Sequence, residues 1–370
     1  MSPRTHYQFA RNIHAWGGAL LAIVLILVSV TGTALVWKRE YLWLTIPEAR
    51  GEFELAPAAA ARIHQVARSH FGAQNVLLTA FSHQNLRLHK VFLRDSQYAY
   101  LTSEGKLLAQ WQAGERVEEL LYDFHHRLLL DTPGLWIVGF SAMFMLGLVP
   151  FGVVAWWSSR RAFRPRLWVR GAWQTRREMR MTHRNMGVVL CLPLACVLAS
   201  GVILVFPQQA QEILLGSSMS QATPLEDAES IAAKPQEATT SRQEYQPKEL
   251  ADAVRAIAVA QAHFEGSRIR SISVSPQDDS VFNIGLQRPD ELHQNGWNNV
   301  TVDGDTEQII KRLDSADLGA TEKLYKLMLP LHTGRVGNIG YRMALSLVGC
   351  GIMLLAGLGL RSFLRSFRKA

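Results

Sequence analysis

Four histidines stand beside the four most apolar segments of the chain. They are His14, His125, His183 and His332, and the segments, which contain no charged side chain, are Ala15–Val36, Leu135–Trp157, Met186–Phe206 and the somewhat shorter Met343–Leu360. A helix needs roughly 20 apolar residues to cross a bilayer, so each segment is expected to span a membrane. An ionisable residue at the end of such a helix is a functional candidate. One histidine per span predicts a protein that binds metal at two places.

The basic residues predict how these helices are oriented. The formal net charge is +8, and the surplus lies before the first span, in residues 158–184 and in the C-terminal tail. Short loops rich in Lys and Arg stay cytoplasmic. We therefore expect a multi-pass membrane protein with both termini in the cytoplasm, rather than a nucleic-acid-binding protein. His14 and His183 then lie at cytoplasmic ends of spans, and His125 and His332 at outer ends.

The chain is expected to contain an internal duplication. His14 precedes Gly32 by 18 residues, and His183 precedes Gly201 by the same number. Each half continues with an amphipathic helical pattern and then with short alternating segments, which predict antiparallel hairpins. The helical patterns are Pro57–Phe71 and Lys248–Phe264, and the expected strands are Val76–Phe81, Leu86–Leu93, Tyr98–Leu101, Ile269–Val274, Val281–Gln287 and Trp297–Val302.

The predicted fold class is therefore a membrane α+β protein, in which a four-helix transmembrane bundle carries two α+β lobes on the periplasmic side. The expected segments are 1–37 (N-terminal segment and first transmembrane helix), 38–124 (first lobe), 125–157 (second transmembrane helix), 158–184 (basic cytoplasmic loop), 185–207 (third transmembrane helix), 208–247 (polar linker), 248–330 (second lobe), 331–361 (fourth transmembrane helix) and 362–370 (basic cytoplasmic tail). The linker has few apolar residues to bury, so most of it is expected to be mobile.

Three motifs make the chain resemble the PepSY-associated transmembrane proteins. They are Asn12–Gly18 leading to Thr31-Gly32, the run Phe124–Leu130, and Leu331–Arg335. The resemblance covers nearly the whole chain and implies that each lobe is a PepSY-like domain. It also implies an activity, because proteins similar to this one include bacterial inner-membrane reductases that bind two b-type haems and reduce ferric siderophores.

The predicted topology pairs the histidines for two such haems. His14 and His183 would ligate one iron near the cytoplasmic face, and His125 and His332 the other near the outer face. Two imidazoles per iron suit a six-coordinate haem used in electron transfer, whereas zinc usually takes three or four protein ligands. His126 competes with His125, since successive helical residues point about 100° apart and cannot both face one porphyrin. The apolar residue before His125 and the leucines after it fit the family pattern better, so His125 is preferred.

Glycines and arginines near these histidines are candidates for contacts with the haems. Gly17 and Gly18 share a helical face with His14, and Gly187 shares one with His183. Glycine inside a helix costs up to about 1 kcal/mol relative to alanine. The glycines would be explained if they leave room for a flat macrocycle beside the helix. The alternative explanation is close packing between helices. The candidate partners of the haem propionates are Arg127 and Arg335 for the outer haem and Arg11 and Arg184 for the inner haem. Alternatively, these arginines anchor the helices at the membrane surface.

Reduction of a ferric siderophore makes few demands on acid–base chemistry. A siderophore binds Fe(III) far more tightly than Fe(II), so one electron loosens the iron, and no catalytic side chain is expected in the lobes. The sequence has no Gly-x-Gly-x-x-Gly after a strand and no room for a flavin or nicotinamide domain, so the electron donor would be a quinol or a separate cytoplasmic reductase. Two other functions stay open. One is a non-enzymatic regulator or sensor of periplasmic peptidases, and the other is a transporter of the siderophore or its iron, although the spans lack charged residues that could line a polar path.

Overall fold

The structure is a computed structural model that describes residues 3–82, 85–157, 173–216, 247–292, 296–336 and 338–367. Most of the predicted basic loop and most of the predicted linker lie outside these residues, and so does the end of the C-terminal tail. The chain divides into two units. The first is Met1–Trp37, Val117–Gln211 and Leu331–Ala370, and the second is Lys38–Arg116 and Glu212–Pro330.

The first unit is built on four long apolar helices. They are α1 (Pro3–Leu35), α5 (Asp131–Trp157), α6 (Arg176–Val205) and α11 (Ile339–Phe367). Among the described residues, these four are long and apolar enough to cross a membrane, which confirms the predicted spans. Some extend past the uncharged segments. The helix α6, for example, begins at a capping box in which Thr175 and Glu178 each bond the other's backbone N–H.

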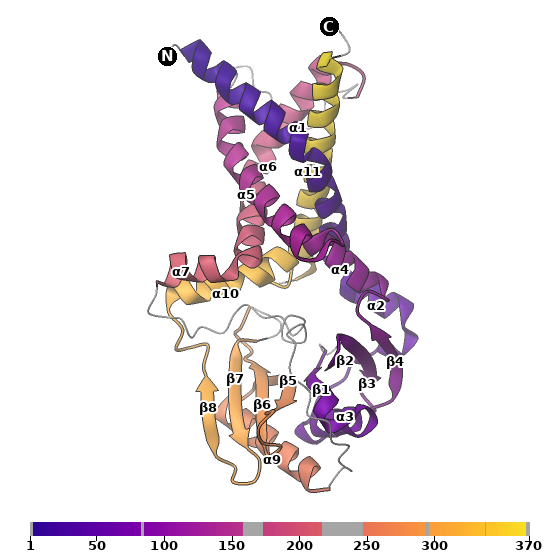
Figure 1. The fold of residues 1–370 in the computed structure, drawn as a ribbon. Helices are drawn as coiled ribbons and strands as arrows, with labels where there is room; N and C mark the ends of the chain where they lie inside the picture. Colours follow the sequence, from indigo (N-terminus) through magenta and orange to yellow (C-terminus); the bar gives the residue numbers. More distant parts are fainter. Residues whose placement is uncertain are drawn as a thin grey trace. The chain divides into compact units, whose positions relative to one another are not determined.

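Each of the four helices packs against two of the others (Figure 1). The helix α1 contacts α5 and α11, and α6 contacts the same two helices, so α1 and α6 lie diagonally across the bundle, as do α5 and α11. Glycines line some of these contacts. A β-carbon at Gly17 would lie 2.9 Å from Leu148, and one at Gly351 would collide with Leu190. Small residues at such positions let neighbouring backbones approach closely.

Two short helices lead into the bundle. The helix α4 (Val117–Arg127) precedes α5, and α10 (Ala320–Thr333) precedes α11. His125 and His332 therefore lie in the last turns of these short helices, not on the long helices that follow them. Between α4 and α5, Leu128 and Leu129 have positive φ, a conformation that residues other than glycine rarely adopt. This sharp turn fixes the direction in which α4 presents His125.

Within the described residues, the second unit contains one eight-stranded antiparallel sheet. Its strand order is β4-β3-β2-β1-β5-β6-β7-β8, and the strands are β1 (Val76–Ala80), β2 (Leu88–Leu93), β3 (Gln97–Thr102), β4 (Leu107–Gln112), β5 (Arg268–Val274), β6 (Val281–Gln287), β7 (Asn298–Asp303) and β8 (Ile309–Leu313). The strands β1 and β5 pair in the middle, with Thr79 opposite Ile272. The sheets expected as two separate lobes are therefore joined into one.

Helices cover both faces of part of this sheet. The helices α3 (Pro57–Phe71) and α9 (Pro247–His263) pack on one face, where Ile63 and Ile257 join buried strand residues such as Leu101 and Ile272 in one hydrophobic core. On the other face, Leu42 packs with Tyr100 and Trp111 in a second cluster. The remaining short helices are α2 (Lys38–Thr45), which carries Leu42, η1 (Pro47–Ala49), η2 (Ala73–Asn75) and α7 (Pro207–Leu215), and α7 occupies the start of the predicted linker.

The second unit buries two neutral histidines. His64 is 2% exposed, and its Nδ1 lies 2.8 Å from the Thr79 hydroxyl on β1. His89 is fully buried, and its ring lies against Phe81. Burial lowers the pKa of each from 6.5 to about 3, assisted by the nearby charges of Arg68 and Arg270 respectively. Folding therefore keeps both rings unprotonated at pH values where an exposed imidazole would already carry a proton.

This burial predicts that acid destabilises the second unit. Below pH 6.5 the unfolded chain binds a proton at each histidine, whereas the folded chain does so near pH 3, so the free energy of unfolding falls as pH drops through that window. For His64 the loss is about 2 kcal/mol at pH 5. Hydrogen exchange of α3 and β1 in the full-length protein, corrected for the intrinsic effect of pH, should show weaker protection at pH 5 than at pH 7. His64→Gln should reduce this difference, whereas His70→Gln, at an exposed position of the same helix, should not. Equal protection of the unsubstituted protein at both pH values would contradict the prediction.

Candidate metal centres in the helix bundle

The structure brings the four predicted histidines together as two pairs. In the first histidine pair, the ring centres of His14 and His183 are 6.0 Å apart. In the second histidine pair, those of His125 and His332 are 6.1 Å apart. Imidazole–metal bonds are about 2 Å long, so two imidazoles on opposite sides of one metal ion place their ring centres about 6 Å apart. Both pairs thus have the spacing of two axial ligands.

Each histidine directs its Nδ1 atom at a polar group of a neighbouring helix. A carbonyl oxygen can only accept a hydrogen bond, so the histidine Nδ1 must carry the proton and donate it. The Nε2 atom then keeps its lone pair, which is the form of imidazole that ligates a metal. The contacts run from His14 to the carbonyl of Leu148 (3.1 Å), from His183 to that of Leu355 (2.9 Å), from His125 to that of Val28 (2.9 Å), and from His332 to that of Val197.

A glycine follows each of these carbonyls by four residues. Residues i and i+4 lie on the same face of a helix, so the carbonyl and the glycine together form one contact surface, here called a glycine cradle. A β-carbon at the glycine would press on the Cε1 atom of the histidine ring. The distances would be 2.9 Å from Gly152 to His14, 3.3 Å from Gly359 to His183, 2.6 Å from Gly32 to His125 and 3.2 Å from Gly201 to His332.

The cradles are exchanged within each half of the chain. The helix α1 carries His14 and provides the cradle for His125, while α5, which follows His125, provides the cradle for His14. The helices α6 and α11 support His183 and His332 in the same reciprocal way. Each histidine pair then joins one half to the other across the bundle. The two histidine pairs therefore lie where the two halves meet.

The structure separates the two histidines that compete for the second pair. The ring centre of His126 lies 5.7 Å from that of His125, and the ring stacks on Tyr122 with the centres 4.1 Å apart. The ring of His125 is the one paired with His332. The geometry therefore favours His125 over His126 as the partner of His332.

The three predicted glycines have different surroundings. Gly17 packs against Leu148 and Phe144 of α5, which is the helix-packing alternative. A β-carbon at Gly18 would meet no atom of the described chain within 4 Å, and one at Gly187 would make an ordinary 3.9 Å contact with Leu355. Gly18 thus has open space beside its α-carbon, whereas Gly17 and Gly187 are in contact with neighbouring helices.

The four predicted arginines lie near the ends of the helices that carry the histidines. Arg11 is exposed on α1 and lies over the ring of Tyr7. Arg127 is 45% exposed, with a guanidinium nitrogen 3.9 Å from Asp123. Arg184 donates to the side chain of Asn185 at 3.2 Å, and Arg335, directly after Gly334, is partly exposed. Their role as partners of propionates stays a prediction.

The donor set is restricted to two imidazoles per centre. Throughout the described ranges, no group of three or more His, Cys, Asp or Glu residues is placed to hold a metal ion. A metal bound at either pair would therefore take its other ligands from water or from a bound group. Haem is such a group, because its porphyrin supplies four nitrogens and leaves two positions for the imidazoles. The imidazole spacing, the proton on Nδ1 and the space beside Gly18 fit haem.

Reasoning from the sequence missed the cradle glycines as functional residues. In the sequence, Gly32 and Gly201 align the two halves, and no local pattern singles out Gly152 and Gly359. A signal was present, since His125 precedes Gly152 by 27 residues and His332 precedes Gly359 by the same number. Equal spacings from a histidine to a glycine in both halves could have indicated paired contacts.

Comparisons with known proteins agree with this helix bundle. A comparison with curated proteins finds no significant match. The family model described as the PepSY-associated TM region matches residues 11–366, nearly the whole chain, and this range includes both histidine pairs and all four cradle glycines. The chain is therefore a membrane protein that belongs to the PepSY-associated TM region family.

Proposed function

We propose that this protein is a di-haem reductase of the bacterial inner membrane that passes electrons across the bilayer to a ferric siderophore. The observation that carries the proposal is the pairing of imidazoles, with ring centres 6.0 and 6.1 Å apart, at two levels of an apolar helix bundle. The family resemblance and the demand for a ligand-supplying group at each pair support b-type haem as the cofactor. Bound there, haem supplies a one-electron carrier that changes charge without proton transfer.

The chain's own residues hold and isolate these carriers. His14 and His183 bind one haem, and His125 and His332 bind the other. The carbonyls of the cradles fix the tautomer and the direction of each ring, which is the usual role of groups behind a metal ligand. Gly18 leaves space on the face of α1 that carries His14, and apolar side chains of the four helices exclude water from the bundle.

The positions of the pairs along the helices suit transfer across a membrane. His14 and Gly32, which cradles His125, are separated by 18 residues of α1, or about 27 Å along the helix axis. This is close to the thickness of the hydrocarbon core, about 30 Å. The arginine-rich segment 158–184 supports a cytoplasmic position for the first pair, in keeping with α1 beginning and α11 ending at the same end of the bundle (Figure 1). The second pair and the sheet unit then lie on the periplasmic side.

An internal duplication accounts for the repeated parts of this arrangement. Each half has a span, a helix with four strands, and a second span, and the strand order runs outward from the β1–β5 contact in both directions. The same histidine–carbonyl–glycine arrangement occurs in both halves. Two copies of one unit would generate both histidine pairs, because each copy supplies one histidine to each pair.

Ferric siderophore is a substrate class whose reduction needs no acid–base catalysis. One electron converts Fe(III) to Fe(II) and weakens its binding while no covalent bond is broken. The electron donor is a quinol or a separate cytoplasmic reductase that acts at the first pair. A transporter is less well supported, because the four spans contain no charged side chain in their apolar segments to line a polar path.

The first test is the visible spectrum of the purified protein and of two neighbouring variants. The unsubstituted protein should show a Soret band and, after dithionite reduction, sharp α and β bands from two haems. His125→Ala should lose one haem because it removes an axial ligand, whereas His126→Ala should keep both. Anaerobic assays with several ferric chelates would then test reduction. A colourless protein prepared gently from haem-replete cells would contradict the proposal.

The second test addresses the cradles. Gly32→Ala puts a β-carbon 2.6 Å from the His125 ring, so the ring must move and the haem of the second pair should be lost or bound more weakly, to about one haem per protein. Gly147→Ala is the matched control, because a β-carbon at this position of α5 meets no described atom within 4 Å. Haem content is measured by pyridine haemochrome per mole of protein. Equal, undiminished haem content in both variants would show that the cradle does not hold the ring.

A further inference from the structure

Among the described residues, the second histidine pair has hydroxyl groups beside Nδ1 that are not found at the first pair. The Oγ1 atom of Thr31 lies 3.3 Å from Nδ1 of His125, and the Oγ atom of Ser200 lies 3.0 Å from Nδ1 of His332. Both hydroxyls come from the residue directly before the cradle glycine. Each Nδ1 proton of the second pair therefore faces two acceptors, a carbonyl and a hydroxyl.

The direction of these hydrogen bonds is fixed by the helices. The Thr31 hydroxyl donates to the carbonyls of Leu27 (3.0 Å) and Val28 (3.1 Å). The Ser200 hydroxyl donates in the same way to Cys196 (2.9 Å) and Val197 (3.0 Å). With its own proton committed to the helix backbone, each hydroxyl presents lone pairs to the histidine, so it acts as an acceptor from Nδ1–H.

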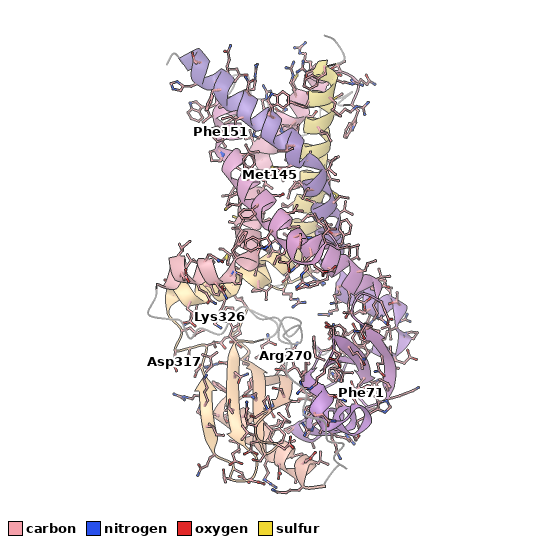
Figure 2. The ribbon with its side chains drawn as sticks, in the orientation of Figure 1. Phe71, Met145, Phe151, Arg270, Asp317 and Lys326 are labelled. Carbon is pink, nitrogen blue, oxygen red and sulfur yellow. The ribbon has the colours of Figure 1, made fainter. Side chains whose placement is uncertain are left out.

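The equivalent positions at the first pair are apolar. Phe151, labelled on α5 in Figure 2, precedes Gly152, and the fully buried Leu358 precedes Gly359. His14 and His183 thus have the backbone carbonyls of Leu148 and Leu355 as their Nδ1 acceptors. The two pairs share one cradle and differ in one hydroxyl per histidine.

An acceptor behind Nδ1 changes the metal-binding strength of the imidazole. The more fully the Nδ1 proton is shared with acceptors, the more negative charge the ring carries and the better Nε2 donates to a metal. A stronger donor stabilises ferric iron over ferrous iron and lowers the reduction potential, because axial ligands and their hydrogen bonds set that potential.

We propose that Thr31 and Ser200 are positioning residues that lower the reduction potential of the haem at the second pair, making it the stronger reductant for its substrate. This inference rests on the proposed function. It gives the hydroxyls a purpose, since an Fe(III) complex that is bound very tightly is hard to reduce and needs a donor of low potential. The haem at the first pair, without hydroxyls, keeps the potential set by carbonyl acceptors alone.

The test is a spectroelectrochemical titration of the full-length protein and of hydroxyl-deletion variants. Thr31→Val and Ser200→Ala should each raise the midpoint potential of the same one of the two haem components, the double variant should raise it further, and the other component should stay unchanged. Thr31→Ser should restore the original value. Thr33→Val is the matched control, because the Thr33 hydroxyl bonds the Ser29 carbonyl and lies against Gly349, away from the histidines.

The outcomes separate this inference from the proposed function. Two haems whose potentials do not move, or move together, in Thr31→Val and Ser200→Ala would overturn the inference and leave the reductase intact. An unsubstituted protein without haem would overturn the proposed function and the inference with it. Where a deletion variant binds too little haem for titration, the EPR signal of its residual low-spin ferric haem gives a second reading, and a signal identical to that of the unsubstituted protein would overturn the inference.

Discussion

The hydrogen bond from a histidine to a helix carbonyl on its neighbour is the constraint on which the bundle depends. Within an apolar membrane segment an N–H without an acceptor costs several kcal/mol, and most carbonyls there already accept from their own helix. A carbonyl has a second lone pair, but the side chain four residues later normally covers it, because helical side chains point toward the N-terminus. Glycine at that position, as at Gly32 and Gly152, uncovers the carbonyl. The imidazole can then bond to the backbone of a neighbouring helix and rest on its surface.

This requirement ties the register of the helices to the geometry of the two histidine pairs. Since α1 supports His125, which precedes α5, and α5 supports His14 of α1, a slide of one helix by a turn would break two cradles at once. The same holds for α6 and α11. The ring centres of each histidine pair can lie about 6 Å apart when α1 is in register with α5 and α6 is in register with α11. Packing glycines such as Gly17 and Gly351 then bring the backbones close enough for these contacts.

Local features of the structure could be predicted from the sequence, whereas contacts between residues far apart in the chain could not. The four spans, the bounds of α3 and the histidines themselves follow from hydropathy, periodicity and position. The glycines at Gly17, Gly18 and Gly187 were chosen because they share a helix with a ligand, but the ring rests on the helix opposite, which no local pattern indicates. Pairing of Thr79 with Ile272 likewise joins strands far apart in the chain. The exposed edge strand β8 lacks the alternation that marks a half-buried strand, so it was missed.

The two histidine pairs also differ in what holds their backbones. His14 and His183 lie within long helices, so their positions follow from the bundle alone. His125 and His332 lie at the ends of α4 and α10, and these helices come directly after β4 and β8, the two edge strands of the sheet. The two segments of the second unit end at Arg116 and Pro330, so both histidines follow shortly after its last residues in the chain. The left-handed residues Leu128 and Leu129 turn the chain from α4 into α5, and such backbone persists where surrounding contacts hold it. A metal shared by His125 and His332 would supply one of those contacts and would close a stretch of chain that contains β5 to β8.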